Sequence, residues 1–346
     1  MTCDTTKGLL GKVACTTIRT TGRAARAAVI AGGRELLPEL PDYGEVPPGE
    51  IVDLPGRGRT FVVDVPGPTP YAPTLVLLHA LSCTAYLGWA ATIGALSQHY
   101  RVVTFDQRWH GRGIRSPRFR LRDCADDVAA VMDSLEIDRA ILAGYSMGGA
   151  IAQQTWHRHH GRVTGLVLCS TASTWKGNKA EQLFFPVMSV ATHPLSAYAL
   201  AKVELRAALL PDSPSVDLSD AHRWARDEFR STSMWMLPEV LAEMGRFDGR
   251  AWLSSVAVPT AVVVTDRDRA IPARRQLEMA AAIPGATVFH APGGHTSVFT
   301  GSRTWLPVFL EAVDSVAVRV RDAAGASQGP GVIPGVLAAG VGTSTA

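Results

Sequence analysis

The hydrophobic pattern of this chain predicts short buried strands separated by helices. Continuous apolar runs rich in β-branched residues are typical of strands that are buried on both faces. Helical stretches, for example residues 124–135, lie between these runs. This alternation predicts an α/β fold with a mostly parallel sheet and helices on both faces. The predicted strands cover residues 61–65, 74–78, 100–105, 140–143, 165–169, 260–264 and 286–289.

The alternation of strands and helices stops between residues 171 and 252. This stretch contains no convincing strand, and prolines divide it into several short helical segments. We predict a helical lid at 171–252, inserted into a sheet domain that comprises residues 45–170 and 253–322. The alternative is an ordinary helical subdomain whose aromatic side chains pack only its own core. Those side chains include Trp175, Trp224, Trp235 and Trp252.

Both ends of the chain differ in composition from the sheet domain. Residues 1–44 are predicted to form a basic helical arm and a proline-rich linker, because 7–31 is alanine-rich with apolar residues at helical spacing. One interpretation packs this helix against the main body or leaves it as a frayed arm. The other is a basic amphipathic helix that contacts an anionic membrane surface. Residues 323–346 carry no charge and are rich in Gly, Ala and Pro, which predicts a disordered tail.

Overall composition narrows the class of protein. The chain has 346 residues, of which 47% are hydrophobic, so it is long enough for a sizeable core, and its net charge of +3 does not indicate nucleic acid as a partner. Its five cysteines are scattered without a C-x-x-C pair, so neither disulfides nor a metal site is predicted. No apolar run approaches the ~20 residues that cross a bilayer, and no secretory signal is evident. We therefore expect a cytoplasmic protein, membrane-associated only through the basic helix.

A serine at the apex of a glycine-flanked turn is the strongest candidate for chemistry. The apolar run 140–143 leads into Gly144-Tyr145-Ser146-Met147-Gly148, and a helix-compatible run follows. A sharp strand-to-helix turn needs glycine at the flanking positions, because side chains there would collide with the neighbouring strand and helix. Such a turn lifts the hydroxyl of Ser146 above the sheet, at a helix N-terminus that stabilises negative charge. A glycine-rich loop between buried elements is the alternative.

A serine nucleophile needs a base, and the base needs a partner that fixes its tautomer. In an open parallel sheet both groups belong in loops at the carboxyl ends of later strands. Asp266 and Asp268 follow one such strand, and either could be the acid. His295 follows the next strand after paired glycines that leave room for it to reach the serine. His290 ends that strand and is interpreted as structural.

Over residues 51–316 the chain resembles the α/β-hydrolase superfamily, in the branch with a helical cap after the sixth strand. The resemblance implies a mostly parallel sheet with helices on both faces and a helical lid. It also implies Asp268 as the acid, because the family pattern G-x-x-D-x-x-x-P falls on 265–272. The motifs that carry the resemblance follow successive strands in the family's order: His79-Ala80-Leu81-Ser82, Asp106-Gln107-Arg108-Trp109-His110-Gly111, the Ser146 turn, 265–272, and Gly294-His295.

The roles implied by the resemblance are those of a serine hydrolase. Ser146 attacks a carbonyl carbon, His295 accepts its proton, and Asp268 orients His295 and stabilises its cationic form. The oxyanion is held by the backbone N–H groups of Met147 and, by family resemblance, Leu81.

The chain departs from the family pattern at three positions. Ala80, Trp109 and Thr265 stand where the family usually has glycine. Alanine is expected to stiffen the oxyanion loop, and the tryptophan either changes the packing of its loop or lines the entrance to the site. None of the three changes removes a catalytic group. The resemblance implies that His79 and His110 are structural residues of their loops.

The serine at the turn excludes relatives that attack through an aspartate. We predict hydrolysis of a carboxylic ester, lactone or thioester through an acyl-enzyme, with a small apolar acyl ester as substrate and with neither cofactor nor metal. The alternatives are a carbon–carbon bond hydrolase and a cofactor-free haloperoxidase or perhydrolase-like enzyme. Carbon–carbon hydrolases typically have a glycine-rich oxyanion loop, which residues 81–84 lack. A non-catalytic relative is disfavoured because all three triad residues are present. The sequence does not indicate an oligomeric state.

Overall fold

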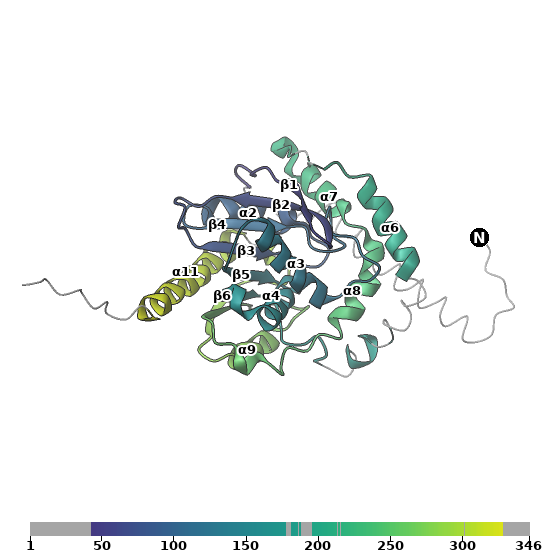
Figure 1. Ribbon diagram of the computed structural model, residues 1–346. Helices are drawn as coiled ribbons and strands as arrows, with labels where there is room; N and C mark the ends of the chain where they lie inside the picture. The colour runs from purple at the N-terminus through teal and green to yellow at the C-terminus, as the bar shows by residue number, and fades with distance from the viewer. Residues whose placement is uncertain are drawn as a thin grey trace, which may run out of the picture. The chain divides into compact units, whose positions relative to one another are not determined.

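An eight-stranded sheet forms the centre of the structure (Figure 1). The structure is a computed structural model that describes residues 43–177, 181–185, 187, 196–212, 214, 216–300 and 302–327. The predicted N-terminal helix, with its membrane contact, and most of the predicted C-terminal tail lie outside the described residues. The strands are β1 (Glu50–Leu54), β2 (Gly58–Val65), β3 (Thr74–Leu78), β4 (Arg101–Phe105), β5 (Ala140–Tyr145), β6 (Val163–Cys169), β7 (Thr260–Thr265) and β8 (Thr287–Ala291).

The sheet is mostly parallel, as the apolar pattern predicts. Its strand order is β1-β2-β4-β3-β5-β6-β7-β8, and only β1 and β2 pair antiparallel with their neighbours. Each predicted strand corresponds to a strand of the structure. The pattern does not predict β1, because this edge strand is short and its charged residues Glu50 and Asp53 interrupt the apolar run.

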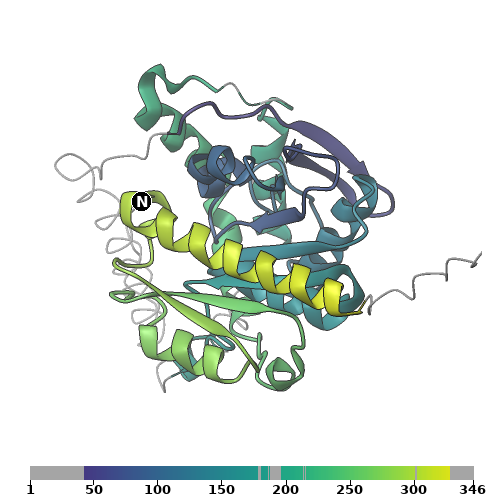
Figure 2. The same cartoon turned by 90° about the vertical axis from the view of Figure 1, so that its left-hand side faces the viewer.

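Helices cover both faces of the sheet. On one face, α3 (Leu121–Ser134), α4 (Met147–Arg158) and α9 (Ala273–Ala281) contribute to one large buried apolar cluster with the strands. On the other face lie α2 (Ala85–Leu96) and α11 (Ser302–Ser327), and Figure 2 shows α11 running across the strands. The helix α11 passes the boundary predicted at residue 322, because alanine favours helix at positions 323 and 324.

Helices also make up the described part of the segment between β6 and β7. Figure 1 shows α6 (Ser196–Ala208), α7 (Ala221–Ser231) and α8 (Leu237–Met244) grouped at one side of the sheet. Apolar residues of this segment, such as Met236 and Val240, belong to the same buried cluster as the sheet. Among the described residues, short helices also occur at η1 (His160–Arg162), η3 (Leu218–Asp220), η4 (Met234–Met236), η5 (Leu253–Ser255) and α10 (Ser297–Thr300).

The tryptophans of this segment mostly pack against other rings. Trp224 meets Tyr43 and Tyr86 edge-on or tilted, Trp175 meets Phe247, and Trp252 stacks on His157. Only Trp235 of the four is exposed, at 51%. The segment is therefore packed onto the sheet domain through aromatic contacts. No helix within the described residues is long and apolar enough to span a bilayer.

Candidate active site

The predicted serine turn is present between β5 and α4. Ser146 has φ of 54° and ψ of −114°, a backbone conformation that non-glycine residues rarely adopt. A Cβ atom at Gly144 would collide with the backbone of Gly148, and one at Gly148 would collide with the carbonyl oxygen of Leu78. The two glycines are therefore required by the close approach of helix and strands, as the sequence predicts.

Three side chains from separate loops meet at this turn. The hydroxyl oxygen of Ser146 lies 2.8 Å from Nε2 of His295, and Nδ1 of the same ring lies 2.8 Å from Oδ2 of Asp268. Asp268 follows β7 and His295 follows β8, so the carboxyl ends of three parallel strands bring them together. Ser146 is 4% exposed, which places the group at the edge of the buried core.

The carboxylate of Asp268 is buried, and both of its oxygens accept hydrogen bonds. Its Oδ1 accepts the backbone N–H groups of Ala270 and Ile271, each at 2.8 Å. Its Oδ2 accepts from Nδ1 of His295 and, at 2.9 Å, from the hydroxyl of Thr265. Burial by itself raises the pKa of Asp268, but the hydrogen bonds from His295, Ile271 and Thr265 outweigh burial and hold the pKa below its usual value. Asp268 is thus ionised at neutral pH and able to fix the Nδ1–H tautomer of His295.

The alternative acid, Asp266, lies elsewhere. Its carboxylate is 2.7 Å from Nδ1 of His290, and both side chains are about half exposed. The structure therefore places Asp268, rather than Asp266, beside His295. His290 contacts Asp266 on the surface, in agreement with its interpretation as structural.

The two histidines of the earlier loops are buried and held by backbone groups. Nε2 of His79 accepts the N–H of Gln107 at 2.9 Å, so its Nδ1 donates to the carbonyl of Ala80. Nδ1 of His110 lies 2.9 Å from the carbonyl of Arg108. Burial and the nearby His110 hold the pKa of His79 well below its usual value, and burial lowers the pKa of His110 to about 4. Both rings are therefore neutral at physiological pH.

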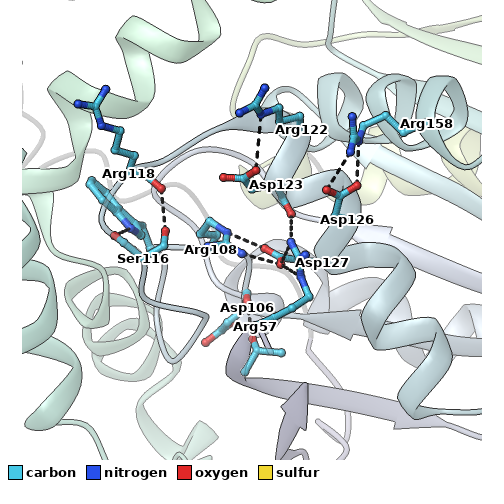
Figure 3. A network of polar contacts seen from close by, with 12 residues as sticks. Arg57, Asp106, Arg108, Ser116, Arg118, Arg122, Asp123, Asp126, Asp127 and Arg158 are labelled. Carbon is cyan, nitrogen blue, oxygen red and sulfur yellow. Dashed lines mark hydrogen bonds and ion pairs between the residues drawn. The ribbon is translucent and has the colours of Figure 1, made fainter. Parts of the chain in front are cut away.

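The loop after β4 is anchored by a buried ion-pair network (Figure 3). Asp127 of α3 accepts from Arg108 at 2.7 and 2.8 Å and from Nε of Arg57 at 2.6 Å. Within the same loop, Trp109 has φ of 67° and is fully buried, with its Nε1 donating to the carbonyl of Ser116. Trp109 therefore packs its loop and does not line an entrance. Its positive φ explains why glycine is usual at this position.

The two predicted oxyanion donors lie on adjoining segments. Met147 begins α4, directly after Ser146, and Leu81 lies in the loop after β3. These segments touch, because the carbonyls of Leu78 and His79 crowd the Cα of Gly148. In the part of the chain that the structure describes, neither the N–H of Met147 nor that of Leu81 donates a hydrogen bond. Both amides are thus available beside the serine turn.

Sequence reasoning missed three side chains that support the site. The hydroxyl of Tyr145 donates to the carbonyl of His295 at 3.1 Å. Gln276 of α9 is fully buried and contacts both Thr265 and Asp268. Thr265 appears in the sequence only as a departure from a family glycine. In the sequence, a role for Gln276 is indicated only by its position as a polar residue on the buried face of an amphipathic helix.

The described residues contain no group of three or more His, Cys, Asp or Glu side chains that could hold a metal ion. The residues that meet at the site supply a hydroxyl, an imidazole and a carboxylate.

Comparison with known proteins relates this arrangement to one family. A family model described as "alpha/beta hydrolase fold" matches residues 73–302, more than half of the chain. The 3-oxoadipate enol-lactonase 1 of Acinetobacter baylyi is 25% identical over 221 residues, which cover 61% of this chain and 77% of that protein. The magnesium-chelatase 30 kDa subunit of Rhodobacter capsulatus is 28% identical over 254 residues, which cover 68% of this chain and 84% of that protein.

Solved structures show the same fold. A hydrolase from Pseudomonas aeruginosa PA01 superposes with a TM-score of 0.60 and 24% identity, covering 78% of this chain and 98% of the other. The family-model match at residues 73–302 contains the serine turn and the loops of Asp268 and His295.

Proposed function

This chain belongs to the alpha/beta hydrolase family, and from that premise we propose that it is a serine hydrolase that cleaves a carboxylic ester bond. The observation that supports the proposal is the continuous pair of 2.8 Å contacts from Ser146 through His295 to Asp268. A serine hydroxyl is a weak nucleophile at neutral pH unless a neutral imidazole accepts its proton, and this arrangement supplies one.

Each step of the proposed reaction uses one of the groups described above. Oγ of Ser146 attacks the carbonyl carbon while Nε2 of His295 takes the hydroxyl proton, and Asp268 stabilises the resulting imidazolium. The N–H groups of Met147 and Leu81 stabilise the oxyanion. His295 then returns the proton to the leaving alcohol, which departs and leaves an acyl-enzyme. Water, deprotonated by the same imidazole, releases the acid.

Lactones are the second substrate class that we propose. A lactone is a cyclic ester, and its ring opening uses the same attack, oxyanion and acyl-enzyme. The name of the Acinetobacter relative, an enol-lactonase, favours this class. A thioester would react by the same route with a thiol as leaving group.

We also propose that the segment 171–252 acts as the lid of this site. Two contacts support this role. Glu228 of α7 is buried and accepts from the hydroxyl of Thr84 at 2.6 Å, close after Leu81 in the oxyanion loop. The hydroxyl of Thr232 accepts the N–H of Gly111 at 3.0 Å. The segment is thereby joined to the two loops that border the serine turn, where it would shape the acyl pocket.

The function is tested by turnover of a series of p-nitrophenyl esters of increasing chain length, beside a lactone series followed by acid release. We expect hydrolysis of at least one series by the wild type and none above background by Ser146→Ala. Equal hydrolysis by the two proteins would refute the proposal. The chain length with the highest kcat/KM defines the acyl pocket.

A further inference from the structure

Thr265 lies at the end of β7, three residues before Asp268, and is fully buried. Its hydroxyl is 2.9 Å from Oδ2 of Asp268, the same oxygen that faces His295. Where the family usually has glycine, this chain therefore has a side chain that contacts the carboxylate of the triad. Glycine has no atom that could make this contact.

The surrounding groups fix the direction of the Thr265 hydroxyl proton. The side-chain amide of Gln276 donates to Oγ1 of Thr265 at 3.1 Å, and the hydroxyl of Ser170 lies 3.0 Å from the same oxygen. An ionised carboxylate accepts only, so Thr265 must donate to Asp268. With its one proton used there, Thr265 accepts from both Gln276 and Ser170.

Gln276 does not replace Thr265 as the donor. Its amide nitrogen carries two protons, and it lies 2.7 Å from the carbonyl of Ile271 and 3.1 Å from Thr265. Its distance to Oδ2 of Asp268 is 3.4 Å, the longest of the three. Besides His295, Thr265 therefore supplies the one short side-chain hydrogen bond to Oδ2 among the described residues.

We propose that Thr265 is a positioning residue that holds the carboxylate of Asp268 in the orientation required by His295. The backbone amides of Ala270 and Ile271 hold Oδ1, and Thr265 holds Oδ2 beside His295, so the carboxylate is fixed at both oxygens. This inference rests on the proposed function, because it assigns Asp268 and His295 to the triad. Thr265 is β-branched within a strand, so its own χ1 is stiff.

The hydrogen bond also affects how the pair takes up a proton. Asp268 and His295 carry a charge of −1 together before protonation and zero after it, and a donor at Oδ2 stabilises the charged state more. Removing the donor therefore raises the pH at which the pair takes up its proton. Tyr145 of β5 also interacts with Asp268: its pKa is raised by burial and, to a smaller extent, by Cys169 and Asp268. Tyr145 is unchanged in the variants below.

The test compares Thr265→Val with Thr265→Ser, and uses Thr260→Val as a matched control. Valine keeps the shape and branching of threonine and removes the hydroxyl, which is both the donor to Asp268 and the acceptor for Gln276 and Ser170. Thr260 is equally buried in the same strand, but its hydroxyl donates to the carbonyl of Val258, away from the site. Steady-state kinetics with the best p-nitrophenyl ester are measured as a function of pH.

For Thr265→Val we expect kcat to fall by about tenfold at nearly constant KM, because a hydrogen bond to a charged group is lost. We also expect the acid limb of kcat/KM to move to higher pH. Thr265→Ser keeps the donor and is expected to retain kcat within about threefold. Thr260→Val is expected to match the wild type. Wild-type kinetics for Thr265→Val, or an equal loss in the valine and serine variants, would overturn the proposal.

A spectroscopic measurement separates failure of this inference from failure of the proposed function. If the wild type hydrolyses no ester, the function is refuted, but the proton between Nδ1 of His295 and Asp268 still gives a downfield NMR resonance. We expect Thr265→Val to move this resonance and Thr260→Val to leave it in place. An unmoved resonance in Thr265→Val would refute the positioning role, whatever the activity.

Discussion

The buried ring of His110 predicts a measurable loss of stability at low pH. Its pKa is about 4 in the folded protein, against an ordinary value of 6.5. The unfolded chain therefore binds more protons between these values, so the free energy of unfolding rises with pH through this window and is lost as the pH falls. At about pH 4.5 the linkage relation gives a loss of about 2–3 kcal/mol relative to neutral pH.

Replacing the ring removes this pH dependence. In His110→Asn the side-chain amide can still donate to the carbonyl of Arg108, but it does not titrate. Urea unfolding at about pH 7.5 and about pH 4.5, followed by tryptophan fluorescence, gives the change with pH for each protein. We expect the wild type to lose about 2–3 kcal/mol more than the variant between the two pH values.

The comparison within each protein cancels any loss of stability that is common to both pH values. His79 lies beside His110, with ring centroids 5.1 Å apart, and its pKa is also held well below its usual value, but this ring is present in both proteins. Burial lowers the pKa of the nearby Arg115 to about 10, which is above both pH values, so Arg115 stays charged throughout. His99→Gln, at an exposed histidine, serves as the control and is expected to behave as the wild type. The same pH dependence in wild type and His110→Asn would refute the assignment of a neutral, buried structural histidine.

Three further predictions follow from the site and its supporting loops. Asp268→Asn should lower kcat by about a thousandfold or more, because His295 then favours the wrong tautomer. Asp266→Asn should change kcat by less than about twofold. A larger loss of kcat in Asp266→Asn than in Asp268→Asn would show that the wrong aspartate was chosen. Trp109→Ala should cost about 3–5 kcal/mol in urea unfolding, and Trp109→Gly about 1 kcal/mol less, because glycine tolerates the positive φ. Asp127→Asn should cost about 3 kcal/mol or more by leaving Arg108 with an uncompensated buried charge, and a neutral result would argue against the network.

Much of the sheet can be predicted from the sequence, because most strands of its parallel part are continuous apolar runs; β8, with alternating exposure, is the exception. The motifs at the strand ends then place Ser146, Asp268 and His295 in separate loops of one sheet edge, and the structure brings these side chains into contact. The edge strand β1 could not be predicted, since Glu50 and Asp53 interrupt its apolar residues and it pairs with a single strand, β2.

The sequence does not predict which side chains from distant positions of the chain contact one another in the fold. The role of Thr265 depends on a hydroxyl that lies 2.9 Å from Asp268, and its orientation depends on Gln276 of the following helix and Ser170 of the neighbouring strand. In sequence the same threonine is only a departure from glycine. The link from Glu228 to Thr84 spans 144 positions and likewise becomes visible only in the fold.

Covalent labelling tests most directly whether Ser146 is an activated nucleophile. The folded protein is treated with a fluorophosphonate, its intact mass is measured, and the modified peptide is identified. We predict a single adduct on Ser146 in the wild type and no adduct in Ser146→Ala. Absence of labelling of the folded wild type, or an adduct that persists in Ser146→Ala, would contradict the account.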